Sequence, residues 1–356
     1  MDKQMDKQII ESAAEELRKK LEESEKQQLK IALFGQPGAG KSSLINSLVG
    51  FEATITGGKT DTTEEAEFHE WSGQNVVLVD LPGYGTKGFP ANDFMESFDI
   101  ESFDMFLCVF AGKFHDADTE FFRKLHRAKR VCLFVRNKLD SMWEQGKSLG
   151  DLKRYVEEDA AIQVASQVKV HFVSCKTGEG MPGLSLAIAD NLDKGHADKW
   201  ARAAKANSVE MLNRKTGACK TRVLIAAGLA AANGLNPVPG VDITIDYAIL
   251  LNLFSEIRGV FGLDEANAKD LASKISPQQM KLYNTLLKYA TKQGVPLLLK
   301  KFMKREAARR VGKYVPLVGQ VIAGSVGFAI TSSAGLSYMK DCHSIAEAIL
   351  EHELQR

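Results

Sequence analysis

Cysteine and net charge are both scarce in this sequence, and each scarcity excludes a class of protein. The chain of 356 residues has five cysteines, an odd number without C-x-x-C spacing, so neither a disulfide framework nor a zinc knuckle is indicated. We therefore expect a reducing compartment. With 46 basic against 45 acidic residues, no net field drives non-specific binding to nucleic acid, and a nucleic-acid partner is not expected. Any function that depends on charge must therefore come from a local cluster of charged residues.

Signatures of metal or thiol chemistry and of secretion are also absent. The seven histidines include no H-E-x-x-H pair, so a metal site built from protein ligands alone is not indicated. The first 30 residues alternate charges of both signs and lack an apolar core, so we expect no secretory signal and a cytoplasmic protein. A hydrophobic fraction of 44% excludes wholesale disorder, and the length predicts a globular chain of about two domains.

Short β-rich runs alternate with helical stretches through the first half of the chain. This alternation is typical of a parallel sheet with crossover helices. The run AEFHEW alternates polar and apolar residues, as expected of an edge strand with one wet face. The six runs are IALFG at 31, AEFHEW at 66, NVVLVD at 75, DMFLCVFA at 104, RVCLFVRN at 130 and KVHFVS at 169.

Both ends of the chain are helical in pattern. Residues 1–30 place apolar side chains at helical spacing between Glu and Lys, which predicts one amphipathic helix. The apolar face of this helix must pack against another surface. After about residue 190 the β signal disappears, and the sequence is rich in Ala, Leu and Lys with helical periodicity. The pattern predicts an α/β domain at 31–193 and an all-α domain formed by 1–30 together with 194–356.

Gly35 to Ser42 fit the pattern G-x-x-x-x-G-K-S between an apolar strand and a helical run, the context in which this loop binds phosphate. Glycines let backbone N–H groups converge on phosphate oxygens, and the helix N-terminus adds its positive end. Lys41 would reach the β- and γ-phosphates, and Ser42 would ligate Mg²⁺. The expected nucleotide-binding residues of this loop are Gly35, Pro37, Gly38, Ala39, Gly40, Lys41, Ser42 and Ser43.

Three further residues are candidates for the magnesium and γ-phosphate site. Asp80 closes an apolar strand and would hold Mg²⁺ through water, whereas Gly83 would approach the γ-phosphate with its backbone N–H. A threonine between the phosphate loop and the Asp80–Gly83 segment would complete the magnesium shell when the γ-phosphate is present. We favour Thr63 over Thr62 for this role. The catalytic candidates are Lys41, Ser42, Thr63 and Gly83, and the metal candidates are Ser42, Thr63 and Asp80.

The loops that follow the β-rich runs at 130 and 169 contain the residues that indicate which nucleotide base is recognised. Asn137, Lys138 and Asp140 belong to N-K-L-D, which closes a strand at the edge where doubly wound sheets bind ligands. The Asp140 carboxylate can accept two hydrogens from guanine, whereas adenine has no such donor pair, and the Lys138 stem can lie across the base. The segment Ser174-Cys175-Lys176 follows the last strand and would supply a backbone N–H for the guanine O6. The predicted ligand is therefore GTP or GDP.

On these motifs the chain resembles the immunity-related GTPases of the dynamin superfamily, and its GTPase domain also resembles Era-like GTPases. The segments that carry the resemblance are G-x-x-G-x-G-K-S-S-x-I-N-x-L, D-L-P-G-Y-G, F-D-M-F-L, F-V-R-N-K-L-D and V-F-G-L-D-E. The second domain also resembles a bacterial, membrane-associated family fused to Era-like domains. The resemblance implies a Ras-like domain, with a mostly parallel six-stranded sheet and helices on both faces, together with a helical domain formed from both termini.

The motifs depart from Ras-like enzymes at two positions. Pro37 occupies a position where Ras-like enzymes have glycine, which leaves little room for an arginine finger. Tyr84 follows the D-x-x-G glycine, where many GTPases place the glutamine that orients water. Self-association through the nucleotide face, as a homodimer or larger oligomer, is one way to complete such a site.

A basic stretch at 300–313 precedes an uncharged run at 314–339. A basic helix leading into an apolar one is attracted to an anionic membrane surface, so residues 300–339 are a candidate peripheral contact. Two alternatives stay open for the uncharged run: it inserts into the membrane, or it forms a buried hairpin within a soluble helical bundle. The rival function is a soluble GTP-dependent switch that docks an RNA or protein partner, although no RNA-binding signature accompanies the basic helix.

Overall fold

A computed structural model describes residues 26–50, 67–71, 74–81, 99–113, 116–234, 247–265, 268–306 and 326–355, together with residues 12, 15, 16, 19, 22 and 23. The chain forms two compact units. The sheet unit comprises Gln28–Asn207, and the helical unit comprises Ser208–Arg356 with Met1–Gln27. In the predicted N-terminal helix, the described positions Glu15 and Glu22 are helical, whereas the apolar residues of its pattern lie outside the described ones.

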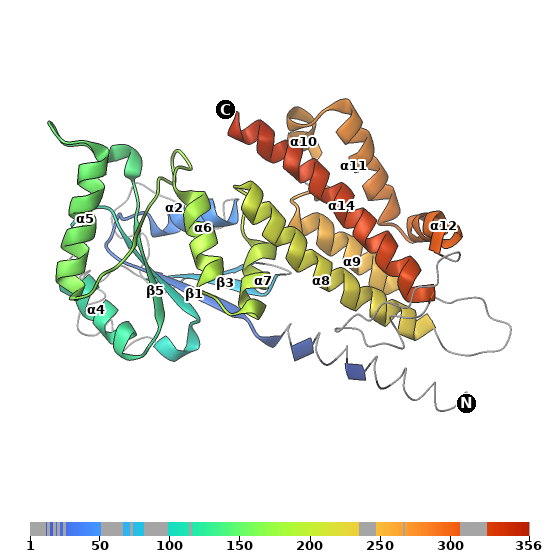
Figure 1. The fold of residues 1–356 in the computed structure, drawn as a ribbon, viewed down its shortest axis with the longest axis horizontal. Coiled ribbons are helices and arrows are strands. Elements are labelled where there is room, and N and C mark those ends of the chain that lie inside the picture. Colours follow the sequence, from blue (N-terminus) through green and yellow to red (C-terminus); the bar gives the residue numbers. More distant parts are fainter. Residues whose placement is uncertain are drawn as a thin grey trace. The chain divides into compact units, whose positions relative to one another are not determined.

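The sheet unit is built on six strands in the order β2-β3-β1-β4-β5-β6. Figure 1 labels β3, β1 and β5 of this sheet. Their bounds are β1 Leu29–Phe34, β2 Glu67–Trp71, β3 Val76–Asp80, β4 Met105–Phe110, β5 Val131–Arg136 and β6 Val170–Phe172. β2 pairs antiparallel with β3 at one edge, and the other pairs are parallel. Each strand lies on one of the predicted β-rich runs. AEFHEW forms the predicted edge strand, although its Phe68 is exposed and its His69 half-buried, so the alternation does not place the apolar side chain inward.

Helices cover both faces of this sheet, as predicted for a Ras-like domain. On one face lie α4, Asp116–Arg127, and α5, Leu149–Val164, which pack against each other and against the sheet. The opposite group comprises α2, Lys41–Val49, α6, Met181–Asp190, and α7, Lys194–Ala203. Two short 3-10 turns, Ile100–Ser102 and Leu139–Ser141, precede β4 and follow β5.

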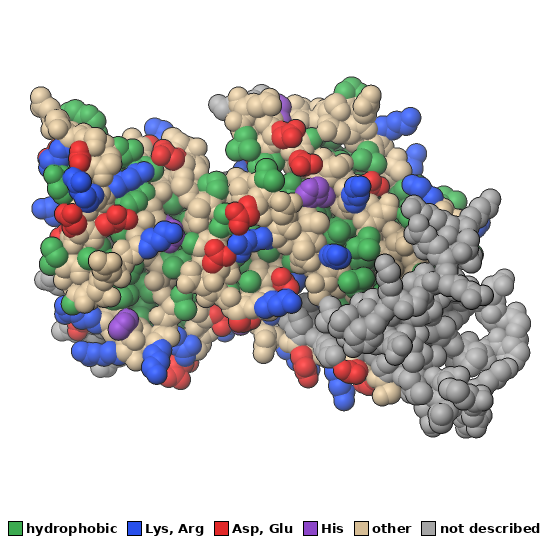
Figure 2. All heavy atoms as spheres, viewed as in Figure 1, with side chains coloured by type: hydrophobic (Ala, Val, Ile, Leu, Met, Phe, Trp, Pro, Cys, Tyr) green, Lys and Arg blue, Asp and Glu red, His purple; other side chains and the backbone are tan. Residues whose placement is uncertain are grey.

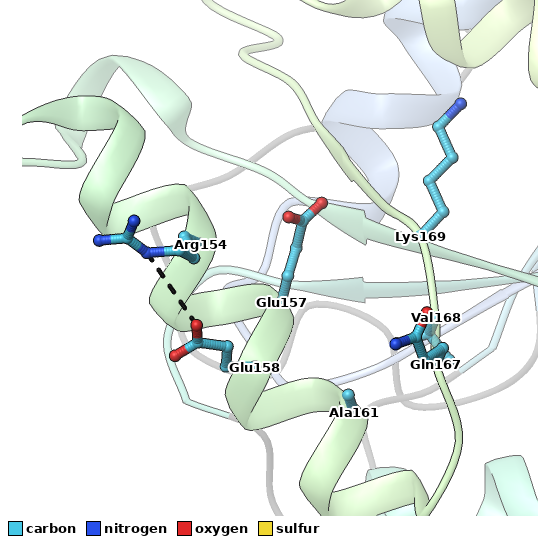
Figure 3. A pocket seen from close by; sticks show the side chains of 7 residues that line it. All are labelled: Arg154, Glu157, Glu158, Ala161, Gln167, Val168 and Lys169. Atoms are coloured by element: carbon cyan, nitrogen blue, oxygen red, sulfur yellow. Dashed lines mark ion pairs between the residues drawn. The ribbon is translucent and has the colours of Figure 1, made fainter.

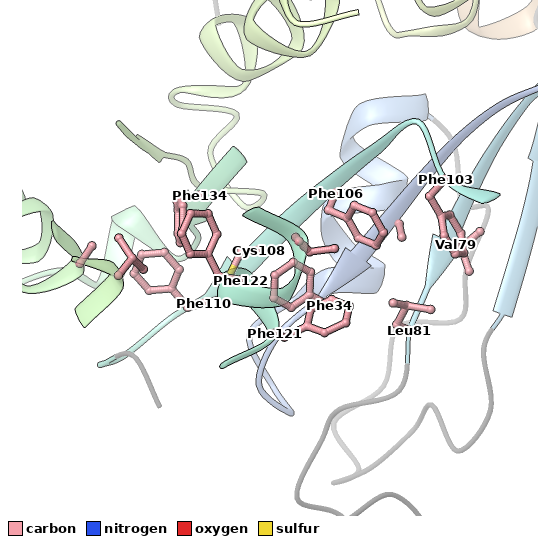
Figure 4. Packing of buried hydrophobic residues seen from close by; sticks show 14 of the residues in the cluster. Phe34, Val79, Leu81, Phe103, Phe106, Cys108, Phe110, Phe121, Phe122 and Phe134 are labelled. Carbon is pink, nitrogen blue, oxygen red and sulfur yellow. The ribbon is translucent and has the colours of Figure 1, made fainter. Parts of the chain in front are cut away.

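Aromatic side chains fill the core between the sheet and α4 (Figure 4). Phe34 of β1 meets Phe121 of α4 edge to face, with ring centroids 4.6 Å apart, and Phe122 meets Phe134 of β5 at 4.8 Å. Such aromatic pairs add about 0.5–1.5 kcal/mol each to the burial of their area. This packing fixes α4 on the strands whose carboxyl ends carry the predicted motifs.

The boundary between the units lies at 207/208, whereas the sequence pattern placed it at 193/194. The difference is α7, which the pattern assigned to the helical domain and which packs against β1 and β3. Trp200 of α7 is fully buried, and its indole Nε1 donates to the Ser185 carbonyl of α6 at 2.9 Å. A helical pattern cannot report this, because an amphipathic helix has the same spacing whichever core it joins.

The helical unit consists of α8 Val209–Gly234, α9 Tyr247–Val260, α10 Ala268–Lys274, α11 Pro277–Tyr289, α12 Gly294–Glu306 and α14 Val326–Leu354 among the described residues. The long helix α14 packs against α8, α9, α11 and α12. Phe254 and Tyr338 stack with centroids 4.3 Å apart, and the Tyr338 hydroxyl donates to the Leu286 carbonyl at 3.1 Å. No described helix is both long and apolar enough to cross a membrane.

Candidate functional site

The predicted phosphate loop lies between β1 and α2, at the carboxyl edge of the sheet. Gly35 has φ +140°, and a Cβ there would lie 1.9 Å from the Val109 carbonyl oxygen, so no side chain fits. Gly38 and Gly40 have left-handed φ values of +73° and +88°, which glycine adopts without steric cost. The loop therefore turns tightly into the N-terminus of α2, where backbone N–H groups lack helical partners.

The side chains that close this loop are polar. Lys41 is 7% exposed, and its Nζ donates to the Gly35 carbonyl oxygen at 3.3 Å, so the cation folds back over the loop. Gln36 Nε2 donates to the Lys113 carbonyl at 2.7 Å and joins the loop to the segment after β4. The sequence pattern missed Gln36, because it occupies a variable position of the motif and carries no signal of its own.

Asp80, the last residue of β3, lies beside the phosphate loop. The Ser42 hydroxyl donates to its Oδ2 at 2.6 Å. Burial raises the pKa of Asp80 above its ordinary value, and the charge of Lys41 and the Ser42 hydrogen bond oppose that rise. Asp80 Oδ1 is buried and has no hydrogen-bond partner in the described part of the chain. An unsatisfied buried carboxylate oxygen beside a hydroxyl fits a hard cation, so these residues suit Mg²⁺.

Asn137 joins three loops of the site. Its Nδ2 donates to the Ala39 carbonyl at 3.0 Å and approaches the Gly40 carbonyl at 3.4 Å. Its Oδ1 accepts from the backbone N–H of Lys138 at 2.8 Å and of Cys175 at 3.4 Å. One buried side chain therefore fixes the phosphate loop, the N-K-L-D loop and the loop after β6 relative to one another.

Asp140 is exposed at the rim, where a base can reach it. The Ser174 hydroxyl donates to Asp140 Oδ1 at 2.6 Å, and this bond lowers the pKa of Asp140. The carboxylate is thus ionised at neutral pH and held in one orientation. The sequence pattern assigned Ser174 only through its loop, whereas the structure gives the hydroxyl a positioning contact. Lys138 has a left-handed φ of 60° at the start of the turn.

Cys175 is a packing residue in this geometry. Burial raises the pKa of its thiol, and Ser47 and Asn137 are its hydrogen-bonding neighbours. A protonated, half-buried thiol is a poor nucleophile. Thr63 and Gly83, the two remaining catalytic candidates, lie outside the described residues, as does Tyr84.

A surface hollow of about 510 Å³ is separate from this constellation (Figure 3). It is lined by Arg154, Glu157, Glu158, Ala161, Gln167, Val168 and Lys169. Residues 167–169 precede β6, so the hollow lies toward the amino ends of the parallel strands, opposite the loops at their carboxyl ends. Its lining carries charges of both signs and no element of the predicted chemistry. The constellation at the carboxyl edge is therefore the candidate site.

Comparison with known proteins points to the same chemistry. The family model for interferon-inducible GTPases (IIGP) matches residues 1–315. Interferon-inducible GTPase 5 of Bos taurus is 26% identical over 90% of this chain and 74% of its own length. Interferon-inducible GTPase 1 of Mus musculus is 32% identical over 71% of this chain and 65% of its own length. The solved structure of Aquifex aeolicus Era, at 18% identity, covers 56% of this chain and 67% of its own, with a TM-score of 0.37.

The family model extends over the sheet unit and most of the helical unit, so the family resemblance seen in the motifs is confirmed over residues 1–315. The chain belongs to the interferon-inducible GTPase family, and it is a GTPase that binds and hydrolyses GTP.

Proposed function

We propose that hydrolysis takes place at the carboxyl edge of the sheet with the motif residues in the roles their chemistry suggests. Lys41 supplies positive charge to the β- and γ-phosphates, and backbone N–H groups of residues 38–43 bind phosphate oxygens. Ser42, Asp80 through water, and Thr63 would hold Mg²⁺, which would neutralise charge on the phosphates. Gly83 donates its backbone N–H to the γ-phosphate. The observation that supports this assignment is the contact of Asn137 with both the phosphate and base loops.

Removing the charge of Lys41 tests the phosphate assignment. We expect Lys41→Ala and Ser42→Asn to abolish GTP hydrolysis while leaving the thermal unfolding midpoint close to that of the wild type. Lys220→Ala is the matched control, since Lys220 is exposed on α8 in the helical unit. A purified Lys41→Ala protein that hydrolyses GTP at the normal rate would refute the role of the loop.

Guanine selection rests on Asp140, held by Ser174, because its paired acceptors match the guanine N1 and exocyclic amine. Asp140→Asn should move preference toward xanthine nucleotides, whose C2 carbonyl accepts from an amide. Competition between GTP, XTP and ATP measures the change. Equal affinity of the wild-type protein for ATP and GTP would overturn the assignment.

We further propose that the site is completed by a second copy of the chain. Pro37 obstructs an arginine finger from an activator, and Tyr84 replaces the water-orienting glutamine. Specific activity should therefore rise with protein concentration, and light scattering with a non-hydrolysable GTP analogue should detect dimers or larger species. Turnover by a monomer at a rate independent of concentration is the result that excludes this proposal.

The last part of the proposal is a peripheral contact with an anionic membrane through α12. This helix exposes Leu297 at 61% and Met303 at 45%, and Lys300 and Lys301 are exposed between them in the sequence. Exposed lysines with exposed apolar side chains on either side in the sequence suit the headgroup boundary of an anionic bilayer. Of the uncharged run at 314–339, the part before residue 326 lies outside the described residues, as do the last basic positions, 307–313. Insertion is not proposed, since Phe328 and its neighbours are buried in the helical unit.

Flotation with phosphatidylcholine vesicles, with and without phosphatidylserine, tests the membrane contact. We expect binding to the anionic vesicles only, weakened by salt and by Lys300→Glu/Lys301→Glu. Lys281→Glu/Lys288→Glu is the control, because both lysines are exposed on α11 and the change in charge is equal. No flotation in any nucleotide state would exclude the contact and favour a switch that docks a soluble partner.

A further inference from the structure

The end of α4 in the sheet unit carries a dense group of basic residues that the GTPase site does not use. We name it the α4 basic patch, and it consists of Arg123, Lys124, His126, Arg127, Lys129 and Arg130. Four of the six, Arg123, His126, Arg127 and Lys129, are exposed, and the other two are half-buried. Blue side chains gather over this end of α4 at the lower left of the space-filling view (Figure 2).

Two members of this group make contacts within the sheet unit. Arg123 Nη2 donates to the Gln163 carbonyl of α5 at 3.1 Å, and the His126 ring lies 5.9 Å from that of Phe122. Lys124 and Arg127 lie in the last turn of α4, where positive charge stabilises the carboxyl end of a helix. Lys129 and Arg130 follow the helix, and their backbone N–H groups donate to the His126 and Leu125 carbonyls at 3.0 and 2.9 Å. The side chains of Arg127 and Lys129 stay exposed at this end of α4.

The α4 basic patch lies at the opposite edge of the sheet unit from the nucleotide loops. α4 connects the carboxyl end of β4 to the amino end of β5, so its last turn and residues 128–130 lie at the amino edge of the parallel strands. The phosphate loop and Asn137 lie at the carboxyl edge. A partner bound at the patch therefore leaves the nucleotide site and its face accessible.

We propose that the α4 basic patch contacts anionic lipid headgroups, so that the GTPase unit itself adds to membrane binding. The proposal rests on the membrane contact argued above and assigns it a second surface. Each Lys or Arg near an anionic leaflet contributes about a fivefold increase in binding at low salt. Phe121 and Phe122 of α4 are only 1% and 8% exposed, so the His126 ring is the one exposed aromatic ring on the described part of α4 that an RNA base could reach. A basic surface with so little stacking area suits a diffuse anionic surface.

The test is the partition of the full chain onto phosphatidylserine-containing vesicles, measured by flotation at low salt. Arg127→Gln/Lys129→Asn removes two exposed cations, and asparagine suits the left-handed φ of 54° at Lys129. We expect the partition to fall roughly 25-fold, since two cations at about fivefold each are removed, with GTP hydrolysis without vesicles unchanged. Lys281→Gln/Lys288→Gln on α11 is the matched control and should partition as the wild type does.

The outcomes separate this inference from the proposed membrane function. If the wild type floats and Arg127→Gln/Lys129→Asn floats equally well, while Lys300→Glu/Lys301→Glu is released, the patch has no lipid role and the α12 contact stands. If the wild type never floats, both proposals fail. A wild type that ignores vesicles but binds an RNA homopolymer in a filter assay, with loss of binding in the patch variant, assigns the patch to RNA and overturns the lipid inference.

Discussion

The amide nitrogen of Asn137 lies 3.0 Å from the carbonyl oxygen of Ala39, so a side chain of the base-recognition motif holds the backbone of the phosphate loop. The two residues are 98 positions apart in the chain. Because Asn137 also accepts from the Cys175 N–H, the positions of three loops depend on one side chain. The loops expected to bind base and phosphate are therefore coupled through Asn137.

Asn137→Ala should weaken GTP and GDP binding together. The substitution leaves buried carbonyl and N–H groups without their partner, at about 1–3 kcal/mol, which corresponds to roughly ten- to hundredfold in affinity. Titration with fluorescent GTP and GDP analogues measures the loss. Asn191→Ala is the control, since its amide also donates to a carbonyl, that of Ala187 at 2.8 Å, but on an exposed helix end. Unchanged affinity in Asn137→Ala would show that the loops are held independently.

Ser174→Ala should shift the acid limb of guanine nucleotide binding to higher pH. Only the ionised Asp140 carboxylate accepts both guanine hydrogens. In the wild type the Ser174 hydrogen bond lowers the pKa of Asp140, so binding is lost only as the pH falls through that lowered value. Without the hydroxyl the pKa rises toward its ordinary value, and binding fails earlier during acidification. The affinity for GDP as a function of pH reports this shift.

A matched control exists on α5 for the same contact. The Ser148 hydroxyl donates to Asp151 Oδ2 at 2.6 Å, and the pKa of Asp151 is likewise lowered, but the pair lies outside the site. Ser148→Ala should leave the pH profile of GDP binding unchanged. Identical profiles for the wild type and Ser174→Ala would show that Asp140 does not titrate in the binding step.

Gly40→Ala should impair nucleotide binding far more than Gly38→Ala. Both residues have left-handed φ values, so each substitution stores about 1–2 kcal/mol of backbone strain. A Cβ at Gly40 would also lie 2.4 Å from Asn137 Nδ2, whereas one at Gly38 meets no atom within 4 Å. The clash separates the phosphate loop from Asn137. Calorimetric titration of the two variants with GDP measures the difference, and equal losses would contradict the steric explanation.

Gly335→Ala should destabilise the helical unit even though alanine favours helices. A Cβ at Gly335 would lie 2.7 Å from Val223 Cγ1 of α8, so α8 and α14 must separate, at about 1–3 kcal/mol. Gly217→Ala on α8, where a Cβ meets nothing within 4 Å, should instead stabilise by about 1 kcal/mol. Chemical unfolding monitored by circular dichroism compares them. Val223→Ala should lessen the penalty in the double variant if the contact is the cause.

Local sequence is enough to establish the strands and the chemistry that follows them. Apolar runs such as NVVLVD become buried strands because continuous hydrophobicity is satisfied only inside a sheet, and the alternation in AEFHEW suits an edge. The phosphate loop, Asp80 and N-K-L-D are recognisable because their chemistry depends on spacing over a few residues. The parallel topology then brings these chain segments to one edge.

Packing between distant segments selects which helix belongs to which unit and which contacts hold the site together. α7 joins the sheet through buried Trp200, although its helical pattern equally suited the other unit. The bonds from Asn137 to Ala39 and from Ser174 to Asp140 link residues far apart in the chain. Phe328, part of an uncharged run that also suited a membrane, is buried in the helical unit. The hydrophobic effect is non-directional, so it favours burial of an apolar segment without determining which segment it packs against. Close packing of the core determines that partner.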